Sequence, residues 1–183
     1  MIHLASNSIS RAKLLNKFGI KFIQKAPEYN EEEIKTKIAR EFVYQASLGK
    51  LKEAIKEFGL KYPLLTADSV ISTEDGQILR KPKNREDAKR ILKLQSDSEI
   101  SIISAMHYKT KDFYLSDISA TYYKFAPFEP KDLEEYLESG LWRGKAGGCM
   151  VEGFCKKYIQ KVTGYKSTAM GLQVEILLNW IKK

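Results

Sequence analysis

The chain has 183 residues, of which 43% are hydrophobic and 11% aromatic, the composition of a folded protein rather than of a disordered one. No apolar run approaches the ~18–20 residues that a membrane helix needs, and no basic leader precedes an apolar stretch at the N-terminus. We therefore expect a single cytoplasmic domain, residues 1–183, without a membrane partner. The 31 basic and 23 acidic residues give a formal charge of +8, which favours anionic partners but does not distinguish a nucleic acid from a phosphorylated metabolite.

The first two dozen residues predict a strand, a helix and a second strand. Residues 2–5 are apolar and form a run short enough for a buried strand. Ser8 or Ser10 is a suitable N-cap for a helix with an apolar stripe, and Gly19 ends that helix. Residues 21–23 then predict the second strand.

A long helix is predicted next. Asn30 precedes three consecutive glutamates, and acidic side chains in the first turn of a helix interact favourably with the helix dipole. Apolar residues continue at helical spacing from Ile34 to Ile55, so we expect the helix to begin at residue 31. Gly49 either breaks this helix or only weakens it.

The rest of the chain alternates between predicted strands and helices. Residues 63–67 predict a buried strand that ends in Asp68, resumes at residues 70–72 and leads into a hairpin turn at Asp75-Gly76. The further elements are a helix capped by Asn84, strands at 100–108 and 113–125, a helix from Pro130 to Gly140, a loop with Gly144, Gly147 and Gly148, and a helix at 172–181. This alternation indicates an α/β domain with a mixed sheet.

Two places in this pattern combine residues that are suited to phosphate chemistry. Asp68 follows an apolar strand, where open α/β sheets place ligand sites, although an acid that only caps a turn gives the same pattern. Arg11 follows Ser6, Ser8 and Ser10 at a predicted helix start. Helix N-terminal amides, hydroxyl groups and a guanidinium together bind phosphate, and a solvated, capped helix is the alternative interpretation.

Other charged residues admit both a functional and a structural interpretation. Lys81 precedes Pro82, which stiffens the loop that carries the lysine. Lys50 and Lys52 are one residue apart on the predicted helix, so they do not share a face. Each of these lysines is alternatively an ordinary surface residue. Glu31 offers a carboxylate to a metal ion, or is simply a helix-start acid.

The cysteines and histidines do not predict a metal site. Cys149 and Cys155 are six residues apart, and the only histidines are His3 and His107, which is too small a set for zinc. We expect free thiols in a reducing compartment and a structural His107 in a strand. The aromatic residues at 122–125 provide either a stacking surface for a base or core packing.

Seven segments of the chain form a pattern when they are taken together. They are LASNSISRAKLL at 4–15, APEYNEE at 26–32, LLTADSVIS at 64–72, LRKP at 79–82, SIISA at 101–105, GKAGGCMVEG at 144–153 and STAMGL at 167–172. This pattern resembles the Maf, or septum-formation, family of nucleoside triphosphate pyrophosphatases. The segments follow the family's order and are spread over nearly the whole chain, which makes the resemblance specific.

The resemblance implies a mixed, twisted β-sheet flanked by helices, with two lobes around a nucleotide cleft as in Maf and ITPase-like proteins, in a homodimer. It implies a hydrolase that converts a nucleoside triphosphate to the monophosphate and pyrophosphate with a divalent cation, Mg²⁺ or Mn²⁺. The role in the cell would be the removal of non-standard nucleotides, and no stable nucleic-acid partner is expected.

Residue by residue, the resemblance makes Asp68 the proposed proton acceptor and, with Glu31, a metal ligand. Arg11 matches the second arginine of the Ser-x-Arg-Arg motif, and Lys81 matches the lysine of the Gly-Lys-Pro motif. A helix lysine of the family matches Lys52, taken as catalytic, or Lys50, taken as substrate-binding, since the alignment is loose by one residue. The remaining substrate-binding residues that it implies are Ser6, Ser8, Ser10, Lys145 and Glu152.

The chain departs from the family at Ser10, where the first arginine is missing, at Ile9, where a proline is usual, at Gln173, where proline is frequent, and at Glu152. Glu152 replaces a glutamine, and a carboxylate only accepts hydrogen bonds, which suits the N1–H and N2–H₂ donors of guanine. The branch of the family that acts on 7-methyl-GTP is similar in having glutamate there and lacking that arginine. We therefore expect a 7-methyl-GTP-like substrate, with dTTP or UTP as the alternative.

A second hypothesis belongs to another class of protein. The basic charge also permits a non-enzymatic nucleotide-binding or nucleic-acid-binding protein linked to cell division, as the family's older name suggests. A binding module would not need the acid at Asp68, so an assay for pyrophosphate release distinguishes the two hypotheses.

Overall fold

The computed structural model describes residues 1–181, and the chain divides into two compact units. Unit 1 contains residues 1–69, residues 103–120 and the described chain from Tyr165 onward, and unit 2 contains residues 70–102 and 121–164. No helix among the described residues is both long enough and apolar enough to cross a membrane.

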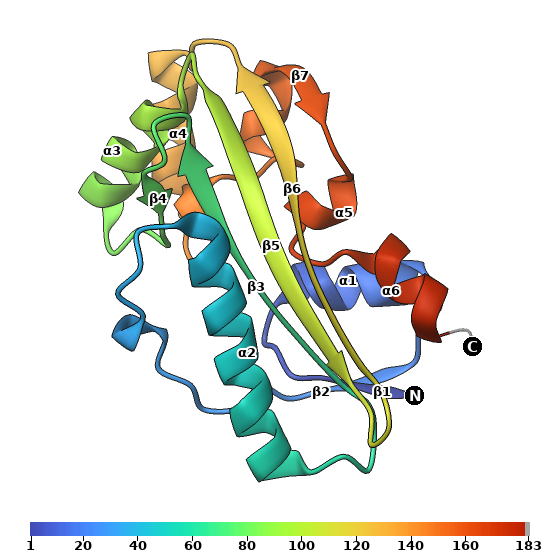
Figure 1. Cartoon of the computed structure of the whole chain (residues 1–183). Helices are drawn as coiled ribbons and strands as arrows, with labels where there is room; N and C mark the ends of the chain where they lie inside the picture. The colour runs from blue at the N-terminus through green and yellow to red at the C-terminus, as the bar shows by residue number, and fades with distance from the viewer. Residues whose placement is uncertain (182–183) are drawn as a thin grey trace. The chain divides into compact units, whose positions relative to one another are not determined.

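The structure has mixed α/β architecture (Figure 1). The strands are β1 (Ile2–Leu4), β2 (Phe22–Gln24), β3 (Leu64–Thr73), β4 (Ile78–Leu79), β5 (Glu99–Lys109), β6 (Tyr114–Phe125) and β7 (Ile159–Thr163). The α-helices are α1 (Ile9–Lys17), α2 (Ala39–Phe58), α3 (Arg85–Gln95), α4 (Pro130–Ser139), α5 (Lys166–Ala169) and α6 (Val174–Ile181), and the 3₁₀ turns are η1 (Glu31–Glu33), η2 (Ala146–Gly148) and η3 (Phe154–Tyr158).

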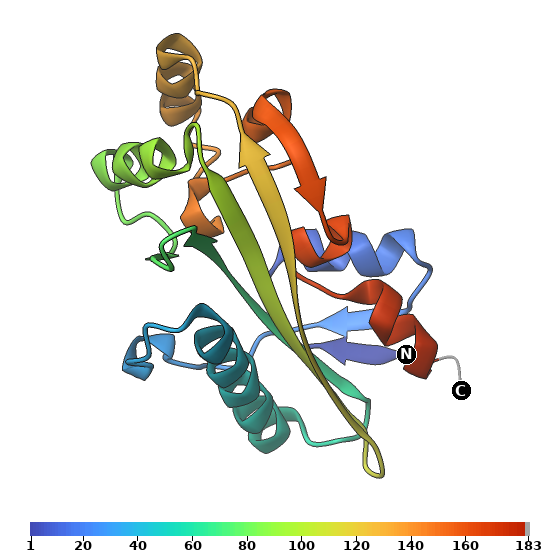
Figure 2. The same ribbon diagram turned by 45° about the horizontal axis from the view of Figure 1, so that its top comes forward.

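The seven strands pair in the order β2-β1-β3-β5-β6-β7, and β4 pairs with β3. Strand β1 runs parallel to both β2 and β3, whereas β4 and β7 pair in the antiparallel sense. Figure 2 shows β1 and β2 side by side and pointing the same way. The predicted mixed sheet flanked by helices is therefore confirmed, and so is the hairpin between β3 and β4.

Unit 1 has apolar side chains on both faces of its part of the sheet. On one face, Leu64 packs in a cluster with Leu51 and Ala54 of α2. On the other face, Leu65 packs in a larger cluster with side chains of α1 and α6, among them Leu14 and Leu177. Successive residues of β3 therefore face α2 and α1 in turn, as the two-residue period of a strand requires.

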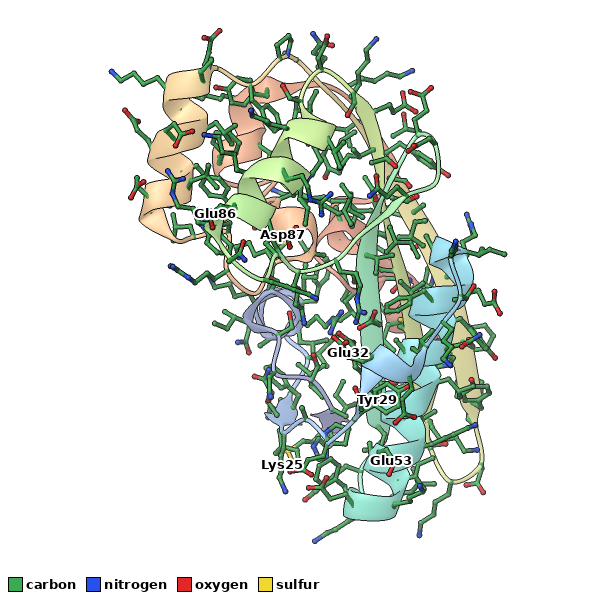
Figure 3. All side chains as sticks on the ribbon, turned by 90° about the vertical axis from the view of Figure 1, so that its left-hand side faces the viewer. Lys25, Tyr29, Glu32, Glu53, Glu86 and Asp87 are labelled. Atoms are coloured by element: carbon green, nitrogen blue, oxygen red, sulfur yellow. The ribbon has the colours of Figure 1, made fainter. Side chains whose placement is uncertain are left out.

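Unit 2 has an aromatic core. The rings of Phe125, Phe128, Phe154 and Tyr158 pack against one another with centroids 4.8–5.6 Å apart. Helix α3 begins as predicted, because the Asn84 side chain accepts a hydrogen bond from the Asp87 amide, and Figure 3 shows Glu86 and Asp87 at this helix start. Of the aromatic residues at 122–125, Tyr123 and Phe125 are buried in the core, whereas Tyr122 is exposed.

The predicted helix start at residue 31 is wrong. Asn30 does cap Glu32, with Oδ1 3.1 Å from the amide nitrogen, but only the short turn η1 follows, and α2 begins at Ala39. The intervening Thr36 hydroxyl accepts a hydrogen bond from the Ile38 amide and donates one to Glu41. These side-chain bonds give the backbone before α2 an alternative to continuous helix.

Gly49 does not break α2, which runs through it to Phe58. A Cβ built at Gly49 would lie less than 3.0 Å from Cζ, Cε2 and Oη of Tyr29. The glycine therefore leaves space for an aromatic ring that lies against the helix backbone.

His107 is a structural residue of β5, as expected, with no solvent exposure. Its Nδ1 lies 2.6 Å from the Tyr114 hydroxyl, its ring stacks on that of Tyr114, and Nε2 lies 3.4 Å from the Tyr44 carbonyl oxygen. Burial lowers the pKa of the imidazole to about 4.

The pKa of His107 predicts a pH-dependent stability. Because the unfolded imidazole has an ordinary pKa, it binds a proton between about pH 6.5 and pH 4 while the folded one does not. Stability should therefore fall as the pH falls through this range, by about 2 kcal/mol between pH 7 and pH 5 from this residue. Urea unfolding at both pH values should show a smaller loss in His107→Gln than in wild type. A His3→Gln control should retain the loss, and equal losses in all three proteins would contradict the prediction.

Candidate active site

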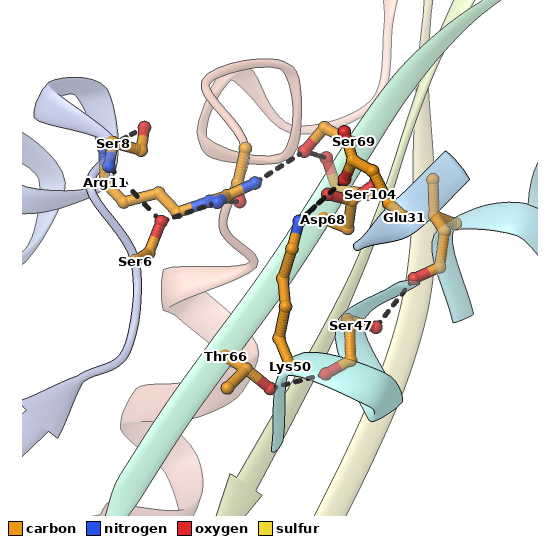
Figure 4. A network of polar contacts seen from close by, with 12 residues as sticks. Ser6, Ser8, Arg11, Glu31, Ser47, Lys50, Thr66, Asp68, Ser69 and Ser104 are labelled. Carbon is orange, nitrogen blue, oxygen red and sulfur yellow. Dashed lines mark hydrogen bonds and ion pairs between the residues drawn. The ribbon is translucent and has the colours of Figure 1, made fainter. Parts of the chain in front are cut away.

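Strand β3 brings two polar networks together, one on each of its faces. Thr66 and Asp68 face α2, and the Thr66 hydroxyl donates a hydrogen bond to the Ser47 carbonyl oxygen at 2.9 Å. Ser69 faces the opposite side, where its hydroxyl lies 2.7 Å from that of Ser104 on β5 (Figure 4). Asp68 is thus in the middle of a ten-residue strand, not at its end as predicted, because the apolar residues after it continue the pairing.

On the α2 face, Lys50 joins two carboxylates. Its Nζ lies 2.5 Å from Oδ1 of Asp68 and 3.1 Å from Oε2 of Glu31, and Figure 4 shows Lys50 reaching Asp68. The side-chain exposures are 20% for Lys50, 10% for Asp68 and 27% for Glu31, so the group is shielded but reachable. Of the two candidate helix lysines, Lys50 contacts Asp68, whereas Lys52 lies exposed on another part of α2.

The two carboxylates beside Lys50 suit a hard divalent cation that also binds the phosphate groups of a substrate. Mg²⁺ is usually held by one or two carboxylates together with substrate phosphates rather than by an all-protein cage. Asp68 and Glu31 supply two carboxylates around one point. Among the described residues, no group of three or more His, Cys, Asp or Glu is arranged to hold a metal ion.

On the other face of β3, Arg11 is a buried cation held by neutral acceptors. Nε donates to the Gly171 carbonyl oxygen at 2.8 Å, Nη1 to the Ser6 hydroxyl at 2.8 Å and Nη2 to the Ser69 hydroxyl at 3.3 Å. Burial lowers the pKa of the guanidinium, whereas the negative charges of Asp68 and Glu31 oppose that effect. Arg11 therefore lies within electrostatic range of both carboxylates.

A guanidinium has five N–H donors, and three of those of Arg11 are used in the described structure. One N–H on Nη1 and one on Nη2 remain, and guanidinium N–H groups are good donors to phosphate oxygens. A buried cation with neutral neighbours and two remaining donors is suited to an anionic ligand.

The C-terminal part of unit 1 supports Arg11. The Ser104 hydroxyl donates to the Thr168 carbonyl oxygen at 2.8 Å, and the Gln173 side-chain amide donates to the Ser104 carbonyl oxygen at 2.5 Å. Gly171 has φ = +99°, and a Cβ there would lie 3.3 Å from Arg11 Nε and 3.2 Å from Ser69 Oγ. Only glycine combines this backbone conformation with so close an approach to the guanidinium.

Sequence reasoning missed these supporting residues. The segment STAMGL contributes to the resemblance, but nothing in its composition indicates that Gly171 accepts a hydrogen bond from a residue 160 positions earlier. Gln173, a departure from the family, bonds this segment to β5 in addition to the bond between Ser104 and Thr168. A glutamine between two apolar residues is the one usable signal in this part of the sequence.

The predicted serines have different roles. Ser6 is buried and bonded to Arg11. Ser8 is the N-cap of α1, and its hydroxyl accepts from the Arg11 amide at 3.4 Å. Ser10 lies in the first turn of the same helix and is partly exposed.

The other predicted site residues belong to unit 2. Lys81 is exposed, and the Gly-rich segment fixes its neighbours: the Gly147 amide donates to the Arg80 carbonyl oxygen at 3.0 Å, and Gly148 lies against Pro82. Lys145 precedes η2 and is partly exposed, whereas Glu152 is exposed in a turn. That turn lies between Cys149 and Cys155, which are buried free thiols with sulfur atoms 3.0 Å apart.

The fold and this site define an α/β protein with a shielded pair of carboxylates and a buried arginine, suited to a phosphorylated ligand. The family model described as Maf-like protein matches residues 1–183. The chain belongs to the Maf family.

Curated relatives match over nearly their whole length. A protein of a Nitratiruptor species, named nucleoside triphosphate pyrophosphatase, is 52% identical over 179 residues, which are 97% of this chain and 96% of that protein. Proteins with the same name from Helicobacter pylori and Campylobacter jejuni are 39% and 34% identical, over 98% and 97% of this chain and 94% and 98% of theirs.

Proposed function

We propose that this protein is a nucleoside triphosphate pyrophosphatase, which hydrolyses a nucleoside triphosphate to the monophosphate and pyrophosphate. The family membership and the names of relatives that match nearly the full chain support this proposal. The observation that carries it is the position of Asp68, whose Oδ1 is bonded to Lys50 in a group that also includes Glu31.

Asp68 is the general base in this proposal. Lys50 holds Oδ1, and Oδ2 is left to accept a proton from a water molecule. The oxygen of that water attacks the α-phosphorus, the bond from the α-phosphorus to the bridging oxygen breaks, and pyrophosphate leaves with the electron pair of that bond. A base held in one orientation lowers the entropic cost of the attack.

Arg11 and Lys50 supply the positive charge that a triphosphate needs. The two remaining donors of Arg11 bind phosphate oxygens. Lys50, which lies beside the carboxylate of Asp68, binds another phosphate oxygen. Asp68 and Glu31 would hold a divalent cation, Mg²⁺ or Mn²⁺, which supplies Lewis-acid stabilisation of charge on the phosphate oxygens when it is bound. Lys81 and Lys145 are proposed to bind phosphate as well, on the basis of the family resemblance.

The deciding experiment measures pyrophosphate release from a panel of nucleoside triphosphates, with Mg²⁺, with Mn²⁺ and with a chelator. The proposal expects turnover that requires a divalent cation. Nucleotide binding without any pyrophosphate release would instead favour the non-enzymatic binding protein linked to cell division.

We further propose a guanine nucleotide with a 7-methyl group as the substrate, since the Glu152 carboxylate accepts hydrogen bonds from guanine donors and favours a cationic base. Replacing Glu152 with glutamine should then lower kcat/KM for 7-methyl-GTP by about tenfold, the cost of one unmatched hydrogen bond to a charged group, and should raise it for dTTP or UTP. Competition assays with both nucleotides measure the change in preference.

A matched control is Glu135→Gln on α4, which alters charge equally elsewhere in unit 2. Wild-type protein that prefers dTTP or UTP would contradict the assignment of the base and leave the pyrophosphatase itself untouched. A homodimer in the cytoplasm is also proposed from the resemblance, and light scattering of the purified protein tests the dimer.

A further inference from the structure

The segment that carries Glu31 has little regular structure of its own. Fourteen residues separate β2 from α2, and only η1 interrupts their irregular path. Ordering such a segment costs about 1–2 kcal/mol of backbone conformational entropy per residue, so contacts with the rest of the protein must hold it. Those contacts decide how firmly the Glu31 carboxylate is presented to Lys50.

The Tyr29 ring makes one of these contacts. It lies on the backbone of α2 at Gly49, in space that any Cβ would occupy, and Figure 3 shows Tyr29 over this helix. Gly49 immediately precedes Lys50, and Tyr29 lies two residues before Glu31. The ring contact and the ion pair of Lys50 with Glu31 therefore attach the same two short segments to each other.

The electrostatic surroundings of Tyr29 place it in the same group. Burial raises the pKa of its hydroxyl; the charge of Lys50 opposes this effect, and the charges of Glu31 and Asp68 reinforce it. The phenol is thus near all three charged residues of the site. If the ring were lost, the hydrogen bond from the Glu32 amide to the Asn30 side chain would still order η1 locally.

We propose that Tyr29, seated on Gly49, is a positioning residue that holds the Glu31 carboxylate against Lys50 and Asp68. This inference rests on the proposed function, and it assigns a role to the pair Tyr29 and Gly49. The aromatic side chain carries the role, since its ring atoms Cζ and Cε2, with the hydroxyl oxygen, fill the space above the glycine.

The test removes the contact between Tyr29 and Gly49 in two different ways. Tyr29→Ala removes the ring, and Gly49→Ala displaces it while adding a residue that favours helix. Each variant should raise the Mg²⁺ concentration for half-maximal activity about tenfold, the usual effect of losing a partner of a metal ligand. The double variant should be no worse than either single one, because both changes remove one contact. Tyr29→Phe, which keeps the ring, and Glu28→Ala, a neighbour in the same segment, should resemble wild type.

Hydrogen–deuterium exchange of the peptide that contains residues 26–34 is a readout that needs neither metal nor turnover. It should become faster in Tyr29→Ala and Gly49→Ala and stay unchanged in Tyr29→Phe and Glu28→Ala. Unchanged exchange in both alanine variants would overturn the inference. Faster exchange with an unaltered Mg²⁺ requirement would also overturn it, since Tyr29 would then only stabilise the segment. If the wild-type protein has no pyrophosphatase activity, the proposed function is contradicted. The exchange experiment then still tests the contact between Tyr29 and Gly49.

Discussion

Replacing Asp68 with asparagine should lower kcat for pyrophosphate release about a thousandfold, which is within the range seen on loss of a general base. Asparagine has nearly the shape of aspartate but does not accept a proton at neutral pH. The variant should still fold, because Lys50 keeps its ion pair with Glu31 and the strand keeps its buried neighbours. Steady-state kinetics and urea unfolding of the same preparation measure both effects.

A matched control for this substitution is Asp112→Asn, an exposed aspartate in the turn between β5 and β6. It should have wild-type kinetics. If Asp68→Asn retains turnover near the wild-type value, Asp68 is not the general base.

Replacing Arg11 with lysine should lower kcat/KM by about a hundredfold or more, although the charge is kept. Lysine has one nitrogen, so it does not reach Gly171, Ser6 and Ser69 together, nor does it present two parallel donors to a phosphate. The buried acceptors left without a donor should also cost about 1–3 kcal/mol of unfolding free energy. Kinetics and denaturant unfolding separate the two losses.

Lys13→Arg is the control for the arginine variant, because Lys13 is exposed on the same helix. It should change neither stability nor activity. A lysine at position 11 that retains wild-type kcat/KM would show that the two remaining donors of Arg11 do not bind the substrate.

The candidate site is predictable from sequence only in part. Local chemistry and the family resemblance together indicate Arg11, Asp68 and one lysine of the pair Lys50 and Lys52, and all of these residues belong to unit 1. The choice between Lys50 and Lys52 needs the rotation of α2 relative to β3, which a short sequence pattern does not contain. The position of Asp68 within β3 follows from the apolar residues after it, which extend the strand beyond the acid.

Two features of the chain around α2 do not follow from local helix propensity. From the sequence, Gly49 is expected to break or weaken the helix, because the Tyr29 ring that occupies the space beside it lies twenty residues earlier. The acidic turn before α2 has the sequence pattern of a helix start, but α2 begins only at Ala39, after the Thr36 hydroxyl has formed hydrogen bonds with the Ile38 amide and Glu41. Local propensity describes each segment alone, whereas the contact of Tyr29 with Gly49 and the side-chain hydrogen bonds of Thr36 are outside it.

The bond from Arg11 to the Gly171 carbonyl oxygen has a consequence for biosynthesis. The acceptor is synthesised 160 residues after the arginine. The three hydrogen bonds that hold the Arg11 guanidinium are therefore complete only after residue 171 has left the ribosome.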